Sequence, residues 1–195
     1  MSASRKTKYN RLMEKAEELF MKFGYKRVSV DDIASEAGIS KMTIYKYFPS
    51  KEALFTEIVL QQVEKHAKIM EYEVNEILSS IEKIEFLFSY GVTLSGKYTV
   101  IFAKDILEMP FVYEKVKAYK EKRMLSLWKS IIQVGMEKGE SRKMDLEFIT
   151  TFLSDIAVTV NKPYYWNEEK GVSWLAENLY DLLKYGLLRG KEEKT

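Results

Sequence analysis

Apolar residues recur every three or four positions along almost the whole chain, which is the spacing of an amphipathic α-helix. Only three prolines and nine glycines interrupt this pattern. No segment alternates apolar and polar residues in the way that a half-buried strand does. The sequence therefore predicts an all-α protein of about nine helices.

The boundaries of the first helices are marked by residues with specific capping roles. A first helical face ends at Gly24, and Ser29 with Asp32 has the spacing of a capping box at the start of the next helix. Gly38 suits a left-handed cap, Ser40 caps the following helix, and Pro49 stops it. After the first helix we expect helices at 30–37, 41–48, about 51–77, 81–95, 98–108, 111–138, 145–161 and 171–189.

Composition excludes several classes of protein. The chain has no cysteine and a single histidine, His66, so we expect no disulfide, no metal site and no cofactor. No apolar run is long enough to span a membrane, and the start is charged, so we expect a cytoplasmic protein. An enzyme has little support because there is no phosphate-binding glycine motif and no evident triad, although a carboxylate pair among the many acidic residues stays open.

Charge is distributed unevenly. Residues 1–55 contain eleven lysines and arginines against seven acidic residues, whereas the remainder contains twenty against twenty-two. A basic N-terminal quarter on a near-neutral body is typical of a nucleic-acid-binding head.

The segment 29–48 has the spacing of a helix-turn-helix, in which the second helix enters the major groove of DNA. Ile44 and Phe48 share a face that can pack on Ile33 of the preceding helix. The opposite face presents cations, hydroxyls and apolar atoms that suit phosphates and base edges. Two short helices joined by a glycine turn also occur in proteins that bind no DNA, so spacing alone leaves both interpretations open.

The residues themselves favour DNA binding. The segment 30–54, VDDIASEAGISKMTIYKYFPSKEAL, closely resembles the N-terminal domain of the tetracycline-repressor (TetR) family. The resemblance begins near Lys8, includes residues 16–20 and 23–25, and covers roughly 50 residues. It implies a three-helix DNA-binding domain at 1–50 and an effector-binding and dimerisation domain at 51–195. Residues 135–140 are also similar to the turn before the family's dimerisation helices.

The resemblance implies a role for each matching position. Ser29 and Lys51 would bind phosphate, and Lys41 and Lys46 would reach phosphates or base edges. Met42 departs from the small residue often found there, so its contact stays open. Thr43, Tyr45 and Tyr47 would contact backbone and groove; for Tyr47, packing beside Phe48 is the alternative.

The C-terminal part contains eighteen aromatic residues after position 55. Most aromatics at helical spacing are ordinary core, but together they can also line a pocket for an apolar or aromatic ligand, as the resemblance implies. For His66, a core or boundary position is the alternative to a ligand-sensing one. The candidate lining residues are His66, Met70, Phe86, Tyr90, Phe102, Met109, Trp128 and Phe152.

The last two helices are the candidates for homodimerisation. One stripe contains Leu146, Ile149, Leu153, Ile156 and Val160, and the other contains Val172, Leu175, Leu179, Leu182, Leu183 and Leu187. Two such helices from each protomer can form a four-helix bundle, and the dimer would face a palindromic operator. A monomer that buries these stripes within its own chain is the alternative.

These observations predict a repressor that releases double-stranded operator DNA when a small effector binds. A DNA-binding protein regulated by a partner, with no small effector, is the alternative.

Overall fold

The computed structural model describes residues 3–95, 100–159 and 172–187. Within these ranges the chain forms nine helices and no strand, which confirms the all-α prediction. In order they are α1 (Ala3–Phe23), α2 (Val30–Ala37), α3 (Lys41–Tyr47), α4 (Lys51–Glu76), α5 (Ser80–Ser95), α6 (Val100–Glu108), α7 (Pro110–Lys138), α8 (Leu146–Thr159) and α9 (Val172–Leu187).

The predicted caps at the start of the chain are confirmed. Ser29 Oγ accepts a hydrogen bond from the Asp32 amide, and the Asp32 carboxylate accepts one from the Ser29 amide, so the capping box is complete. Gly38 has φ of +58°, and the amides of Gly38 and Ile39 donate to the carbonyls of Ser35 and Ala34. These paired bonds are a Schellman motif, which explains why α2 ends where it does.

α3 is one residue shorter than predicted. Ser40 Oγ accepts from the Thr43 amide at its start, as expected. Phe48 lies outside the helix with φ of −132° and ψ of 124°. The residue before a proline is pushed into the extended region by the proline ring, so Pro49 ends the helix one position early.

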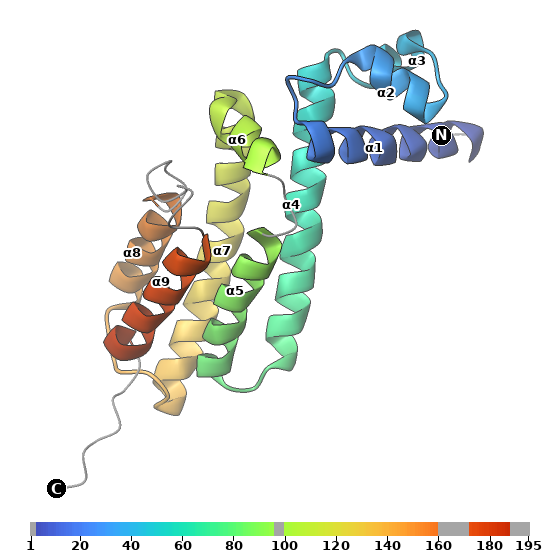
Figure 1. Ribbon diagram of the computed structural model, residues 1–195. Coiled ribbons are helices and arrows are strands. Elements are labelled where there is room, and N and C mark those ends of the chain that lie inside the picture. The colour runs from blue at the N-terminus through green and yellow to red at the C-terminus, as the bar shows by residue number, and fades with distance from the viewer. Residues whose placement is uncertain (1–2, 96–99, 160–171, 188–195) are drawn as a thin grey trace, which may run out of the picture. The chain divides into compact units, whose positions relative to one another are not determined.

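The chain forms two compact units, which do not divide at residue 50. The first takes Met1–Lys65 and Tyr98–Val116, and the second takes His66–Lys97 and Lys117–Thr195. In the first unit, α1 lies across the N-terminal part of α4, with α2 and α3 on one side of α1 (Figure 1). Its core joins Phe20 of α1, Ile33 of α2 and Ile44 of α3, all fully buried.

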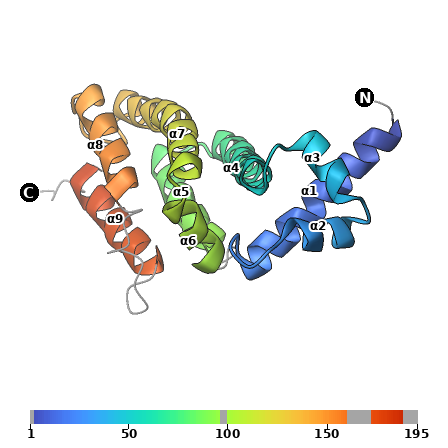
Figure 2. The ribbon, with the colours of Figure 1, turned by 90° about the horizontal axis from the view of Figure 1, so that it is seen from above.

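The second unit contains α5, α8 and α9 with the later parts of α4 and α7. α5 packs along α9, and α8 lies beside α9 in both views (Figures 1 and 2). Its core has two clusters. The first cluster lies between α4, α5 and α7 and is formed by Val74, Ile84 and Ile131. The second cluster lies between α7 and α8 and is formed by Ile132, Ile149 and Leu153.

An ion pair joins α4 to α7 inside the second unit. The Arg123 guanidinium donates to both oxygens of the Glu71 carboxylate, at 2.6 and 2.8 Å, and also contacts the Tyr119 hydroxyl. Both charged side chains are about one-third exposed. A two-pronged pair of this kind stabilises a fold more than a fully exposed pair does.

Replacing Arg123 with glutamine is expected to lower the free energy of unfolding by about 1 kcal/mol near neutral pH. Hydrogen bonds from Arg123 lower the pKa of Glu71 below its ordinary value of 4.5. The stabilisation is therefore present above that value and is lost as the pH falls through the lowered pKa. Urea titrations at about pH 7 and about pH 3 should show a smaller difference between wild type and variant at the lower pH. If wild type and Arg123→Gln differed in free energy of unfolding by the same amount at both pH values, the stabilising role of the Arg123–Glu71 pair would be contradicted.

Candidate functional site

The exposed face of α3 is built by the packing of its other face. Ile44 is fully buried and Phe48 is buried just beyond the helix end, so both point into the core of the first unit. This packing leaves the opposite side of a seven-residue helix in solvent. Met42 is 69% exposed and Tyr45 is 43% exposed, so both side chains are available to a partner.

Lys41 and Lys46 flank these two side chains and are also exposed. The Lys41 ammonium bonds the Asp31 carboxylate of α2 at 2.9 Å, which raises the pKa of Lys41. Both side chains of this pair are largely exposed, so the contact contributes little stability and can exchange for a phosphate. The exposed face of α3, which consists of Lys41, Met42, Tyr45 and Lys46, is called the reading face below.

The other predicted DNA-binding residues are partly engaged within the chain. Thr43 is half-buried, and its hydroxyl lies 2.9 Å from that of Ser40. Tyr47 is half-buried and packs edge-on against Tyr9 of α1, with ring centroids 5.4 Å apart. Ser29 forms the N-cap of α2, so its hydroxyl already has partners.

Lys51 is held inside the first unit. Its ammonium donates to the backbone carbonyls of Tyr25 and Val28, at 2.8 and 2.9 Å, and lies 4.0 Å from the centre of the Tyr25 ring. Burial lowers the pKa of Lys51, because removing the ammonium from water disfavours its charged form. This position is different from the phosphate contact that the resemblance implied.

Two long-range contacts within the first unit were not predicted from the sequence. The Arg11 guanidinium of α1 donates to the Gly38 carbonyl at 3.0 Å, so it contacts the turn directly before α3. Asp105 of α6 is buried, and its carboxylate accepts from the Tyr25 amide at 2.6 Å. These contacts span 27 and 80 positions, so no local pattern in the sequence signals them.

Five of the eight predicted ligand residues come together in the second unit. Met70 and Phe86 pack on the cluster around Val74, as does Trp128. Tyr90 lies beside Phe86, and its hydroxyl is 2.8 Å from His66 Nδ1. Burial raises the pKa of Tyr90, so this hydroxyl stays protonated near neutral pH. These five residues therefore combine apolar side chains with the polar pair His66 and Tyr90.

The other three predicted ligand residues lie elsewhere. Phe102 is fully buried in the first unit, where its ring packs edge-on against Phe55, and Met109 packs on the same core. Phe152 is exposed on α8 and stacks on Phe148, with ring centroids 6.1 Å apart. Phe102 and Met109 therefore lie in the core of the first unit, and Phe152 lies on the surface of α8.

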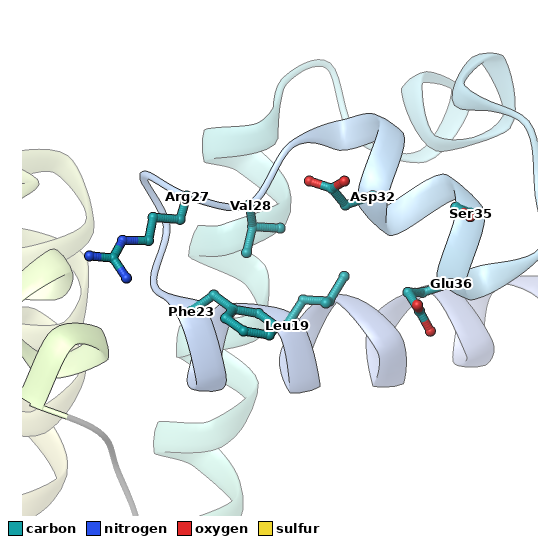
Figure 3. Close-up of a pocket in the computed structure, with 7 residues that line it drawn as sticks. All are labelled: Leu19, Phe23, Arg27, Val28, Asp32, Ser35 and Glu36. Carbon is teal, nitrogen blue, oxygen red and sulfur yellow. The ribbon is translucent and has the colours of Figure 1, made fainter.

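A groove of about 340 Å³ lies between the end of α1 and α2 (Figure 3). Leu19 and Phe23 form its floor, Asp32 and Glu36 lie on the α2 side, and Arg27 extends away from α2. None of its lining residues belongs to α3 or to the predicted ligand set.

Sequence comparison matches residues 12–58 to the family of bacterial regulatory proteins described as the tetR family. The chain is 30% identical over 150 residues to YhgD of Bacillus subtilis, an uncharacterised HTH-type transcriptional regulator, in a match that covers 73% of this chain and 75% of YhgD. It is 24% identical over 147 residues to the fatty acid metabolism regulator of Bacillus subtilis, covering 71% and 73%.

Solved structures share the fold along nearly the whole chain. A transcriptional regulator from Saccharomonospora viridis in complex with choline has a TM-score of 0.74 at 20% identity, covering 97% of this chain and 100% of that one. FadR from Bacillus subtilis in complex with stearoyl-CoA has a TM-score of 0.66 at 22% identity, covering 90% and 97%. At these identities the likeness shows the fold alone. Among the helices that the structure describes, none is long and apolar enough to cross a membrane.

Proposed function

Because the chain belongs to the TetR family of DNA-binding transcription regulators, which are not enzymes, we propose that it is a repressor that a small effector releases from a palindromic operator. We keep the functional division proposed from the sequence, with DNA binding in residues 1–50 and effector binding and dimerisation in 51–195. A protein that acts on chromosomal DNA works in the cytoplasm of a bacterium, and we place it there.

The observation that carries the DNA-binding part is the reading face. A buried Ile44 orients α3 so that Met42 and Tyr45 project from the molecule between two lysines. Apolar and aromatic atoms suit thymine methyl groups, and lysines suit phosphates and guanine edges. We therefore assign base recognition to Met42 and Tyr45. Thr43 and Tyr47 are proposed as secondary contacts from the half-buried edge.

Dimerisation is proposed through exposed faces of α8 and α9. Ile149 and Leu153, two residues of the stripe predicted on α8, are buried against Ile132 within the chain. The side left exposed carries the stacked pair Phe148 and Phe152. α9 exposes three further large apolar side chains, which are Trp174, Leu182 and Tyr185. The proposed interface therefore moves to these five residues, because a group of exposed apolar side chains on the last two helices suits an interaction surface.

A twofold axis through such an interface gives the protein two reading faces. Two recognition helices about 34–36 Å apart contact successive major grooves on one side of DNA. This arrangement is the reason for proposing a palindromic operator.

The effector region is proposed around His66, Phe86 and Tyr90. The aromatic and aliphatic side chains in this region suit an apolar or aromatic molecule. The His66–Tyr90 pair offers it one hydrogen-bonding partner. Similar structures hold ligands as different as choline and stearoyl-CoA, which supports response to a small molecule without naming it. An effector that prefers one arrangement of the two heads shifts the population away from the DNA-binding one.

The test begins with selection of a duplex from a random-sequence pool by the full-length protein. We expect an enriched palindrome, bound with an affinity that falls steeply with salt, because lysines at the reading face displace counterions. Failure to enrich any sequence, or binding that is insensitive to salt, would contradict the proposed function.

The effector is then sought by thermal shift with a panel of lipophilic and aromatic compounds. Compounds that raise the melting temperature should also release the selected duplex, since only a ligand with different affinities for the two states shifts them. His66→Phe and Tyr90→Phe should weaken this response and leave DNA binding unchanged. A panel without a single stabilising compound would favour a regulator controlled by a partner instead.

A further inference from the structure

The connection between α1 and α2 is held at one residue, Tyr25, through both its amide and its carbonyl. On one side, the Asp105 carboxylate of α6 accepts the Tyr25 amide hydrogen at 2.6 Å. On the other, the Lys51 ammonium at the start of α4 donates a hydrogen bond to the Tyr25 carbonyl at 2.8 Å. The same ammonium lies over the face of the Tyr25 ring. Tyr25, Lys51 and Asp105, all in the first unit, are called the Tyr25 clamp below.

One stripe of α6 faces this connection. Ile101, Asp105 and Glu108 are spaced four and three residues apart, so they share a face of the helix. Glu108 pairs with Lys26 at 2.7 Å. A Cβ atom built on Gly24 would lie 2.3 Å from Ile101 Cγ2 and 2.8 Å from Asp105 Oδ2. The backbone at Gly24, with φ of +81°, is thus in direct contact with α6.

The clamp lies next to the helix-turn-helix in the chain. Lys51 also bonds the Val28 carbonyl, and the following residue, Ser29, is the N-cap of α2. α2 in turn ends in the Schellman turn that leads directly into α3. We therefore expect a displacement of the α1–α2 connection to move the N-cap of α2. Through the hydrogen-bonded turn between α2 and α3, it would also move the reading face.

Burial makes the polar contacts of the clamp consequential. Asp105 is only 5% exposed, so its carboxylate depends on donors within the protein. A buried hydrogen bond to a charged group has strict geometry, and leaving such a group without its partner is costly. The exposed Lys26–Glu108 pair has less strict geometry and is less costly to break. The clamp, not that ion pair, is therefore expected to determine where the connection lies.

We propose that Asp105 and Lys51 are positioning residues for operator binding, which hold the α1–α2 connection at the backbone of Tyr25 and so orient the helix-turn-helix. Lys51 acts through the Tyr25 and Val28 carbonyls and does not contact a phosphate. α6 contributes to this clamp through Asp105. The proposal rests on the DNA binding described above.

Salt dependence separates positioning from phosphate contact. The duplex selected by the wild-type protein is titrated between about 50 and 200 mM salt with full-length variants. Lys51→Met, which keeps most of the side-chain stem, is expected to lower affinity about tenfold and to leave the slope of log K against log salt unchanged. Lys46→Met, on the reading face, should lower the slope by about one. If Lys51→Met also lowered the slope of log K against log salt by about one, the proposal would be overturned.

Asp105 is tested with two replacements of similar size. Asp105→Leu removes the acceptor and is expected to lower affinity about tenfold, whereas Asp105→Asn keeps an acceptor for the Tyr25 amide and should recover most of it. Glu108→Ala, on the same stripe of α6, is the matched control and should change affinity less than about twofold. Equal losses for the leucine and asparagine variants would show that only packing matters and would contradict the hydrogen-bond role.

Hydrogen exchange tests the clamp without DNA. Exchange of the Tyr25 amide should accelerate about tenfold in Asp105→Leu and much less in Asp105→Asn, while amides in the second unit keep their protection. An unchanged rate at Tyr25 overturns the clamp even if DNA binding is intact. Accelerated exchange without any selected duplex would support the clamp and reject the proposed function, so the two failures are distinguishable. If Asp105→Leu does not fold, DNA affinity and hydrogen exchange are both measured on Lys51→Met.

Discussion

The double substitution Phe148→Glu/Phe152→Glu is expected to yield a folded monomer that binds the operator duplex about 100-fold more weakly than the wild type. Phe148 is 68% exposed and stacks on Phe152, so neither ring contributes to the buried clusters of its own chain. Four negative charges across the twofold axis would repel, and the apolar contact would be lost. Without the dimer, the second head no longer binds as part of the same molecule, and the gain from effective concentration disappears.

Sedimentation measures the oligomeric state, and anisotropy with the selected duplex measures affinity. Tyr72→Glu is the matched control, because Tyr72 of α4 is 66% exposed in the same unit but lies outside the proposed interface. We expect this control to stay dimeric and to bind normally. A dimer that survives both phenylalanine replacements would remove α8 from the proposed interface.

The second large effect is expected at the reading face. Met42→Ala/Tyr45→Ala should reduce the preference for the selected duplex over random DNA by about 100-fold, because each good base contact contributes about 1–3 kcal/mol of discrimination. Both side chains are exposed, so melting should change little. No charge is removed, so affinity for random DNA and its salt slope should stay as in the wild type.

Competition titrations with the selected and the random duplex provide this measurement. Tyr72→Ala, an exposed aromatic of the second unit, is the control for surface truncation. A uniform loss on both duplexes would mean that Met42 and Tyr45 support binding without reading bases. In that case Lys41, Thr43 and Lys46 would become the candidates for recognition.

The local structure of the head could be predicted because its causes lie within a few residues. Ser29 and Asp32 satisfy each other's backbone amides, and Gly38 takes up a left-handed conformation that other residues avoid. The buried face of α3 follows from helical spacing, and so does the exposed face opposite to it. All nine predicted helices are found within the described residues, and the helix predicted to end at Phe48 ends one position early. The ends predicted at 98, 161, 171 and 189 lie outside the residues that the structure describes.

Helical spacing identifies an apolar stripe but does not tell which of two neighbours will cover it. On α8, Ile149 and Leu153 are covered by Ile132 of the same chain, and the phenylalanines one position away remain exposed. Phe102, predicted to line an effector cavity, packs on Phe55 in the core of the first unit. These outcomes depend on which helices meet in space, and the period of the sequence contains no information about that.

The sequence by itself determined the helices, their caps and the residues that α3 exposes, because hydrogen bonds between near neighbours and a 3.6-residue period control all three. Only the tertiary structure decided the partners of long side chains. Lys51 could extend outward to a phosphate or inward to two carbonyls, and it lies inward because the α1–α2 connection places acceptors within its reach. Asp105, 80 residues from the amide it binds, gains its role from the packing of α6 alone.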